Sequence, residues 1–169
     1  MPGPMAGNDG TDQSPMRLIE VVLDEASITQ ATPDIEREQR VAVFDLLENN
    51  FFKLESHPDA GPYNLKLAIA DNRLVLEISG ENGDHLTTFI LSLSRFQKIV
   101  RDYFLVCGSY FEAIKTAPPS QIEALDMGRR GLHNEGSQLV MERLDGKIEV
   151  DFDTARRLFT LISALLWKG

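Results

Sequence analysis

The sequence predicts an α+β fold, in which a single domain has an antiparallel sheet of about four strands and about four helices on one face of that sheet. The expected order is β-α-β-β-β-α-α-α. Alternating hydrophobic residues near the N-terminus and over residues 63–93 are typical of half-buried strands. Hydrophobic residues at i, i+3, i+4 and i+7 elsewhere are typical of helices. A chain of 169 residues can form one domain, here residues 16–169, with a sizeable core.

The first elements follow a tail. Residues 1–15 are rich in Gly, Pro, Asp and Ser, which predicts disorder. Alternation predicts a strand over Arg17–Leu23. Thr32–Asp34 then supplies a capping hydroxyl, a proline for the first helical position and an acid near the positive end of the helix dipole. We therefore expect a helix from this point to about Glu48.

Three further strands are predicted to form a meander. Tyr63–Ala70 and Arg73–Ser79 are separated by Asp71-Asn72, and Asn82-Gly83 leads into His85–Leu93. Both dipeptides tolerate the left-handed backbone of tight hairpin turns. The segment before the meander, residues 53–62, holds two prolines and a glycine and is predicted to be a loop.

A long amphipathic helix is predicted from Arg95 to about Lys115. Its apolar side chains have helical spacing, and we expect them in the core rather than in a stacking platform for bases or a flat cofactor. They are Phe96, Ile99, Val100, Tyr103, Cys107, Tyr110, Phe111 and Ile114. Cys107 is the only cysteine, which excludes an intramolecular disulfide and any site that needs several thiolates.

Residues 122–144 allow two structures. If they form one helix, Gly128 and Gly136 each cost about 1 kcal/mol against alanine, and close approach of another backbone or of a ligand would explain them. Alternatively, Gly128 or Gly131 ends the helix and a loop carries residues 133–135. The last helix is expected to begin at Asp153 and to be apolar nearly all round.

The polar residues most suggestive of a site lie between Leu125 and Arg157. The candidate ligand or partner patch consists of Arg129, Arg130, His133, Asn134, Glu135, Asp151, Asp153, Arg156 and Arg157. On a helix, Asp126 is spaced to pair with Arg130. Arg129 beside His133 calls for an anion, either a carboxylate of Asp151 or Asp153 or a ligand phosphate.

Arg156 and Arg157 pose a second electrostatic question. They follow the expected helix start at Asp153, where cations are unfavourable, so we expect upstream acids from Asp145 to Asp153 to neutralise them. Two alternatives stay open. The patch is either an internal ion-pair network or two arginine pairs that converge on one anion.

Catalytic motifs in this region are incomplete. The His-x-Glu of zinc deaminases occurs at His133 and Glu135 without its cysteine pair. Residues 151–154 imitate the nucleophile step of haloacid-dehalogenase phosphatases, but too little chain follows for the rest of that fold. His133, Glu135, Asp151 and Asp153 are suitable metal ligands with generic spacing. No metal site and no cofactor are predicted.

Charge and hydropathy limit the partners. The net charge of −9 divides into −10 over residues 1–94 and +1 over residues 95–169. Because an acidic surface repels phosphate backbones, nucleic acid is not expected. No apolar run is long enough to cross a membrane, and the N-terminus lacks the pattern of a secretory signal. We expect a cytoplasmic protein.

Four strings carry a resemblance to a known family: RLIEVVLDEASI, LSLSRFQKIVRDYF, PSQIEALDMGRRGLHNEGSQ and GKIEVDFDTARRLFTL. They resemble the alphaproteobacterial uncharacterised protein family 0262, over roughly Met16 to Trp167. The resemblance implies a small cytoplasmic bacterial protein and assigns no activity, cofactor or catalytic residue.

Two functional hypotheses follow. The first is an interaction or regulatory protein without catalytic activity, with an unknown protein partner. The alternative is a small enzyme or binding protein for a phosphate- or carboxylate-bearing ligand. In that case Arg129, Arg130, Arg156 and Arg157 would hold the anion and His133 would act as acid–base.

Overall fold

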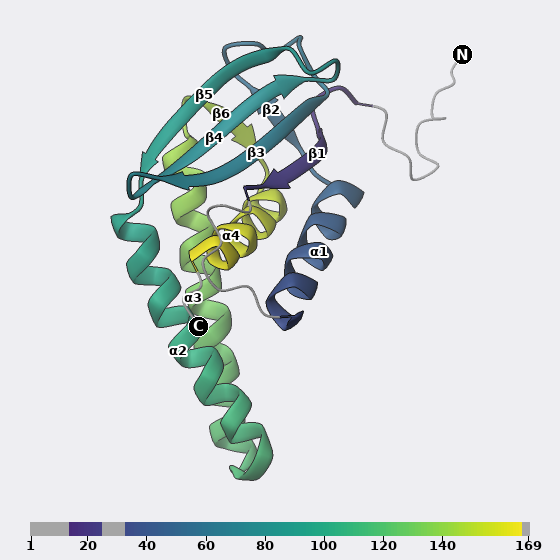
Figure 1. The fold of residues 1–169 in the computed structure, drawn as a ribbon. Helices are drawn as coiled ribbons and strands as arrows, with labels where there is room; N and C mark the ends of the chain where they lie inside the picture. The colour runs from purple at the N-terminus through teal and green to yellow at the C-terminus, as the bar shows by residue number, and fades with distance from the viewer. Residues whose placement is uncertain (1–13, 25–32, 167–169) are drawn as a thin grey trace, which may run out of the picture.

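Four helices cover one face of a four-stranded sheet in the computed structural model, which describes residues 14–24 and 33–166 (Figure 1). The expected α+β class and the order of the main elements are confirmed. The prediction of a disordered tail and the capping role of Thr32 lie outside the described residues, except for positions 14 and 15.

The sheet has the strand order β1-β3-β4-β5. Its strands are β1 (Leu18–Leu23), β3 (Tyr63–Ala70), β4 (Arg73–Gly80) and β5 (His85–Ser92). The three-strand meander is antiparallel as predicted. Its turns use the expected residues, because Asp71, Asn72 and Gly83 all have positive φ.

One pairing corrects the expectation of a wholly antiparallel sheet. β1 pairs with β3 in parallel, so the sheet is mixed. Parallel neighbours need a crossover connection, and here the chain between them contains helix α1 (Pro33–Glu48). Local alternation reports which side chains are buried but carries no information about strand direction.

Two short strands form a second sheet that the sequence did not reveal. β2 (Phe52–Leu54) pairs antiparallel with β6 (Ile148–Val150). The predicted loop over residues 53–62 is therefore wrong at its start. Three residues are too few to show a period, although Phe52, Leu54, Ile148 and Val150 are all buried.

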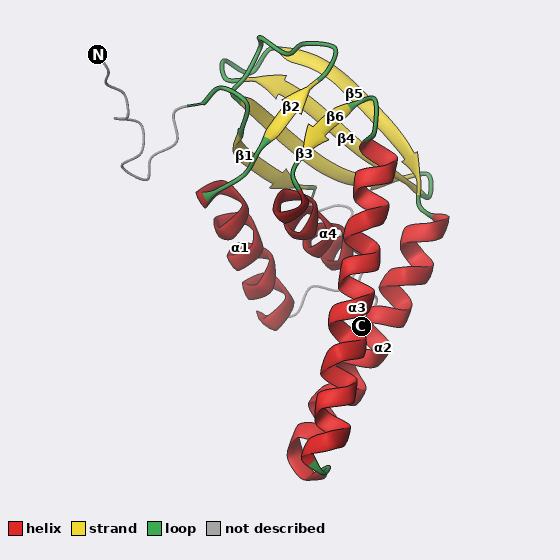
Figure 2. Cartoon of the chain, turned by 180° about the vertical axis from the view of Figure 1, so that it is seen from behind, coloured by secondary structure: helices red, strands yellow, loops and turns green. Residues whose placement is uncertain are grey.

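The second and third helices form an antiparallel hairpin whose far end projects beyond the rest of the molecule (Figure 2). They are α2 (Ser94–Thr116) and α3 (Pro119–Leu144). α3 is continuous, which decides between the two structures left open for residues 122–144. The last helix, α4 (Phe152–Leu166), packs against both α1 and α3.

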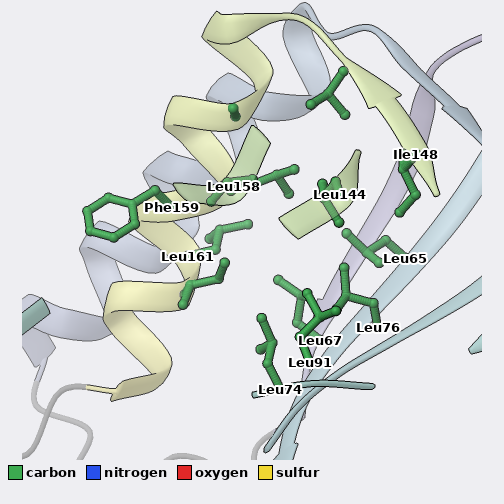
Figure 3. Packing of buried hydrophobic residues seen from close by; sticks show 14 of the residues in the cluster. Leu65, Leu67, Leu74, Leu76, Leu91, Leu144, Ile148, Leu158, Phe159 and Leu161 are labelled. Atoms are coloured by element: carbon green, nitrogen blue, oxygen red, sulfur yellow. The ribbon is translucent and has the colours of Figure 1, made fainter. Parts of the chain in front are cut away.

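The main core lies between the sheet and the helices. Figure 3 shows Leu65, Leu67, Leu74, Leu76 and Leu91 of the sheet facing Leu144, Leu158 and Leu161. Phe159 points from α4 away from the sheet (Figure 3). Its ring is fully buried and makes edge contacts with Tyr103 of α2 and His133 of α3.

The ring of Phe159 explains Gly136. A Cβ built on Gly136 would lie 2.2 Å from the nearest ring atom of Phe159, so only glycine fits there. The close approach at this glycine is thus made by an aromatic ring of the same chain, and not by the backbone or ligand that we expected. Gly131 differs, because a Cβ there would meet nothing within 4 Å.

Candidate functional site

The start of α4 places the aspartates of the candidate patch. Asp151 Oδ1 accepts a hydrogen bond from the backbone N–H of Thr154 at 2.8 Å, so Asp151 is the helix cap. The expected helix start and cap at Asp153 are wrong, since Asp153 is already in the first turn. The buried hydroxyl of Thr154 accepts the backbone N–H of Phe51 at 2.9 Å, which fixes α4 against the chain before β2.

The first arginine pair is held by one carboxylate on its own helix. Asp126 accepts a hydrogen bond from Arg129 and forms an ion pair with Arg130 at 3.0 Å. The pair with Arg130 is the one that the spacing predicts, and Asp126 rather than Asp151 or Asp153 also serves Arg129. The hydrogen bond from Arg129 holds the pKa of Asp126 below its usual value.

Arg129 lies between the two helices of the hairpin. Its guanidinium carbon is 4.9 Å from the centre of the Tyr110 ring, a cation–π contact. Nearby, burial raises the pKa of Tyr103 to about 12 and also raises the pKa of the Cys107 thiol. These two groups are therefore un-ionised at neutral pH, and neither is activated as a nucleophile. From the sequence we expected Tyr110 only in the core, and its contact with Arg129 was not predicted.

His133 is held uncharged. Its Nε2 is 3.0 Å from the hydroxyl of Thr160, and that hydroxyl donates to the carbonyl of Arg156 at 3.2 Å. Because the Thr160 hydroxyl hydrogen is used in this way, His133 Nε2–H donates to the Thr160 oxygen and His133 Nδ1 carries the lone pair. Burial lowers the pKa of His133 to about 4, with further lowering by Arg156 and Arg129.

The remaining members of the patch lie at or near the surface. Arg156 is 4.0 Å from the carboxylate of Asp153, and Arg157 donates to the backbone carbonyl of Asp153 at 3.5 Å. Of the upstream acids, Glu149 pairs instead with Lys53 of β2. Asn134 and Glu135 lie on the exposed side of α3.

Arg129 and Arg156 both lie close enough to His133 to lower its pKa, while each arginine pair has an aspartate on its own helix. Two buried atoms in the patch, Arg129 Nε and His133 Nδ1, have no hydrogen-bond partner among the described residues. Nowhere in the described chain do three or more His, Cys, Asp or Glu side chains gather as metal ligands. A hollow of about 10 Å³ lies elsewhere, between the sheet and the helices, and has room for no more than a water molecule.

A second feature is the apolar stripe of α2, which we define as Phe96, Val100, Cys107, Phe111 and Ile114. At its start the stripe is core, because Phe96 and Val100 are buried. At its far end Phe111 is 60% exposed and Ile114 is 51% exposed. The expectation that all eight apolar side chains of this helix pack in the core is therefore wrong for these two, because the hairpin extends past the body that covers the others (Figure 1).

Fold and site together define a small α+β protein with a projecting helical hairpin and a polar cluster held by its own aspartates. Residues 15–168 match the Uncharacterised protein family (UPF0262), and the chain belongs to that family. None of the helices in the described ranges is long and apolar enough to cross a membrane.

The relatives match over nearly their whole length. A UPF0262 protein of Rhizobium meliloti is 58% identical over 91% of this chain and 96% of its own. One from Mesorhizobium japonicum is 55% identical over 95% of this chain and 99% of its own. One from Brucella canis is 58% identical over 90% and 95%, respectively. No solved structure matches the chain.

Proposed function

We propose that this protein is a non-catalytic interaction module of the bacterial cytoplasm, with a regulatory role, and that it docks a partner protein on the far half of α2. The observation that carries the proposal is the apolar stripe. It is core for its first half and bare at Phe111 and Ile114, on a hairpin that projects from the body. A helix face that is apolar along its whole length but covered along only half of it fits a second protein that covers the rest.

The partner that fits best is an amphipathic helix with acidic residues beside its apolar face. Asp126 is one carboxylate between two guanidinium groups, Arg129 and Arg130, so these three side chains together keep one positive charge. Arg129 is adjacent to the stripe, since it lies over Tyr110 and acts on the pKa of Cys107. An acidic flank on the partner would complement that charge and fix its orientation.

Binding of a small anion at the Arg/His patch is the second candidate. The unpartnered Arg129 Nε and His133 Nδ1 favour it. The bond between Asp126 and Arg129 weighs against it, because an anion would compete with a carboxylate already in place. Thermal stabilisation by inorganic phosphate that disappears in Arg130→Ala would favour this candidate, and no stabilisation would count against it.

Substitution of the bare side chains tests the first proposal. In Phe111→Ser/Ile114→Ser, the free energy of unfolding should change by no more than about 0.5 kcal/mol per site, because both side chains are more than half exposed. The matched control is Phe44→Ser on α1, a phenylalanine that is 64% exposed and lies one helical turn from the exposed Val41. Tagged chains would replace the relative in Rhizobium meliloti and be purified from it. A discrete protein should accompany the wild type and Phe44→Ser but not the double variant. Equal recovery with all three chains would refute the proposal.

A further inference from the structure

The two edges of the four-stranded sheet differ in how they are protected. At the start of the β1 edge, the buried side chain of Asn50 pairs with the backbone of Leu18 as a neighbouring strand would. Its Oδ1 accepts the backbone N–H of Leu18 at 2.8 Å, and its Nδ2 donates to the carbonyls of Leu18 and Leu46 at 3.2 and 2.9 Å. β1 also carries an exposed charge at Glu20. Both devices are ways in which native sheets block an edge.

The β5 edge has neither device. Its eight residues, HLTTFILS, include no Asp, Glu, Lys, Arg or Pro, and within the described chain the strand pairs with β4 alone. Every second residue of an edge strand directs its N–H and C=O away from its one neighbour, so β5 presents a row of open backbone groups from Thr87 to Ser92, after the register shift at Leu86. Ile90 is 58% exposed on the outer face, and Leu86 and Phe89 are half-buried on the edge.

We propose that the β5 edge pairs antiparallel with the β5 edge of a second copy of this chain, which joins two four-stranded sheets into one sheet of eight strands. This inference does not depend on the proposed function, because it uses the sheet edge and not the far half of the hairpin. Open backbone groups along a strand can pair with another extended strand, and the side chains of β5 indicate which one.

The distribution of charge in and around β5 favours a second copy of this chain as the binding partner. Two-fold pairing sets a strand against itself, which is unfavourable for a charged strand but not for one without Asp, Glu, Lys or Arg. The exposed residues that bracket β5 have opposite charges, Asp84 before it and Arg95 after it. Antiparallel pairing brings Asp84 of one copy toward Arg95 of the other. Arg95 now lies 3.6 Å from Glu142, and both of these side chains are largely exposed.

The alternation of β5 also suits this pairing. Opposite residues of an antiparallel pair point to the same side of a sheet. Pairing centred on Phe89 would set Phe89 against its own copy and Thr88 against Ile90, all on matching faces. Thr88 and Ile90 are both exposed and both β-branched, a favourable cross-strand pair.

The test is sedimentation velocity of the full chain over the micromolar concentration range. The wild type should be a dimer. Ile90→Lys and Ile90→Glu should each raise the dissociation constant at least about tenfold, because two like charges then lie diagonally across the two-fold axis, within reach of each other on long side chains. An equimolar mixture of the two variants should restore a dimer. The matched control is Val22→Lys, which changes a residue that is 44% exposed on the opposite edge strand, and it should sediment like the wild type.

The mixture separates lost pairing from lost folding, since two misfolded chains would not restore each other. A monomeric wild type would overturn the proposal. So would a dimer that Ile90→Lys leaves as tight as the wild type, because another surface would then hold it. A mixture that stays monomeric, or a Val22→Lys variant that dissociates as readily as Ile90→Lys, would also overturn it.

Discussion

Gly136→Ala and Gly131→Ala form a matched pair that tests how α3 packs on α4. Both replace a glycine within the same continuous helix, and alanine has the better helix propensity by about 1 kcal/mol at each position. At Gly131 a Cβ meets nothing within 4 Å, so Gly131→Ala should raise the free energy of unfolding by about 0.5–1 kcal/mol.

At Gly136 the same methyl group would overlap a buried ring. The added Cβ would lie 2.2, 2.3 and 2.6 Å from three ring atoms of Phe159, well inside the carbon–carbon contact distance of about 3.5 Å. The ring is enclosed by Tyr103 and His133, so it cannot turn away freely. Overpacking of this kind costs about 3 kcal/mol. After the gain in helix propensity, Gly136→Ala should lose about 2 kcal/mol.

Urea unfolding of both variants and of the wild type measures these changes in the free energy of unfolding. The comparison holds if the m-values of the three chains are equal. The predicted difference between the two variants is about 3 kcal/mol. A second substitution, Phe159→Leu in the Gly136→Ala background, should recover part of the loss because the smaller side chain makes room. Equal stability of the two single variants would refute the packing of Phe159 on Gly136.

Three further predictions concern single side chains. Folding lowers the pKa of His133 from 6.5 to about 4, so its contribution to stability is complete above pH 6.5 and is lost as the pH falls to about 4. The pKa difference corresponds to about 3 kcal/mol, which partial exposure of the ring reduces to about 1–2 kcal/mol. His133→Gln should flatten this part of the stability–pH curve. A slope that His133→Gln leaves unchanged would contradict the burial of an uncharged imidazole. Asn50→Ala leaves three backbone groups of β1 and α1 without the side chain that binds them. It should lower the free energy of unfolding, measured with denaturant, by about 2–4 kcal/mol. The control Asn49→Ala changes an exposed side chain and should lower it by under about 0.5 kcal/mol. Asp151→Ala should lower the free energy of unfolding by about 1 kcal/mol, because α4 loses its N-terminal cap. Asp153→Ala should lower it by under about 0.5 kcal/mol. A larger loss in Asp153→Ala than in Asp151→Ala would show that Asp153 is the cap.

Most of the fold could be predicted because most of its signals are local. The turn at Asp71-Asn72, the meander and the long helix α2 follow from residue type and periodicity within a few neighbours. The parallel pairing of β1 with β3 could not be predicted in this way, since it depends on where the chain returns after α1. The β2–β6 pair joins segments nearly a hundred residues apart, each too short to show a period.

The same distinction between local and long-range signals applies to the candidate site. The ion pair between Asp126 and Arg130 spans one helical turn and could be predicted from spacing. The contact between His133 and Thr160 joins two helices and left no mark in the sequence. Periodicity also placed Phe111 and Ile114 on the apolar face of α2 correctly, but it carries no information about whether the body extends far enough to cover them.

Site-specific photo-crosslinking tests the central claim, that the far half of α2 docks a partner protein, most directly. A photoreactive phenylalanine analogue would replace Phe111 in one chain and Phe44 in another, both expressed in Rhizobium meliloti in place of the relative. The two native side chains have similar exposure, at 60% and 64%, so chance encounters should label both positions alike. We predict a discrete adduct with a second protein at position 111 and none at position 44. No adduct at position 111, or the same adducts at both positions, would contradict the claim.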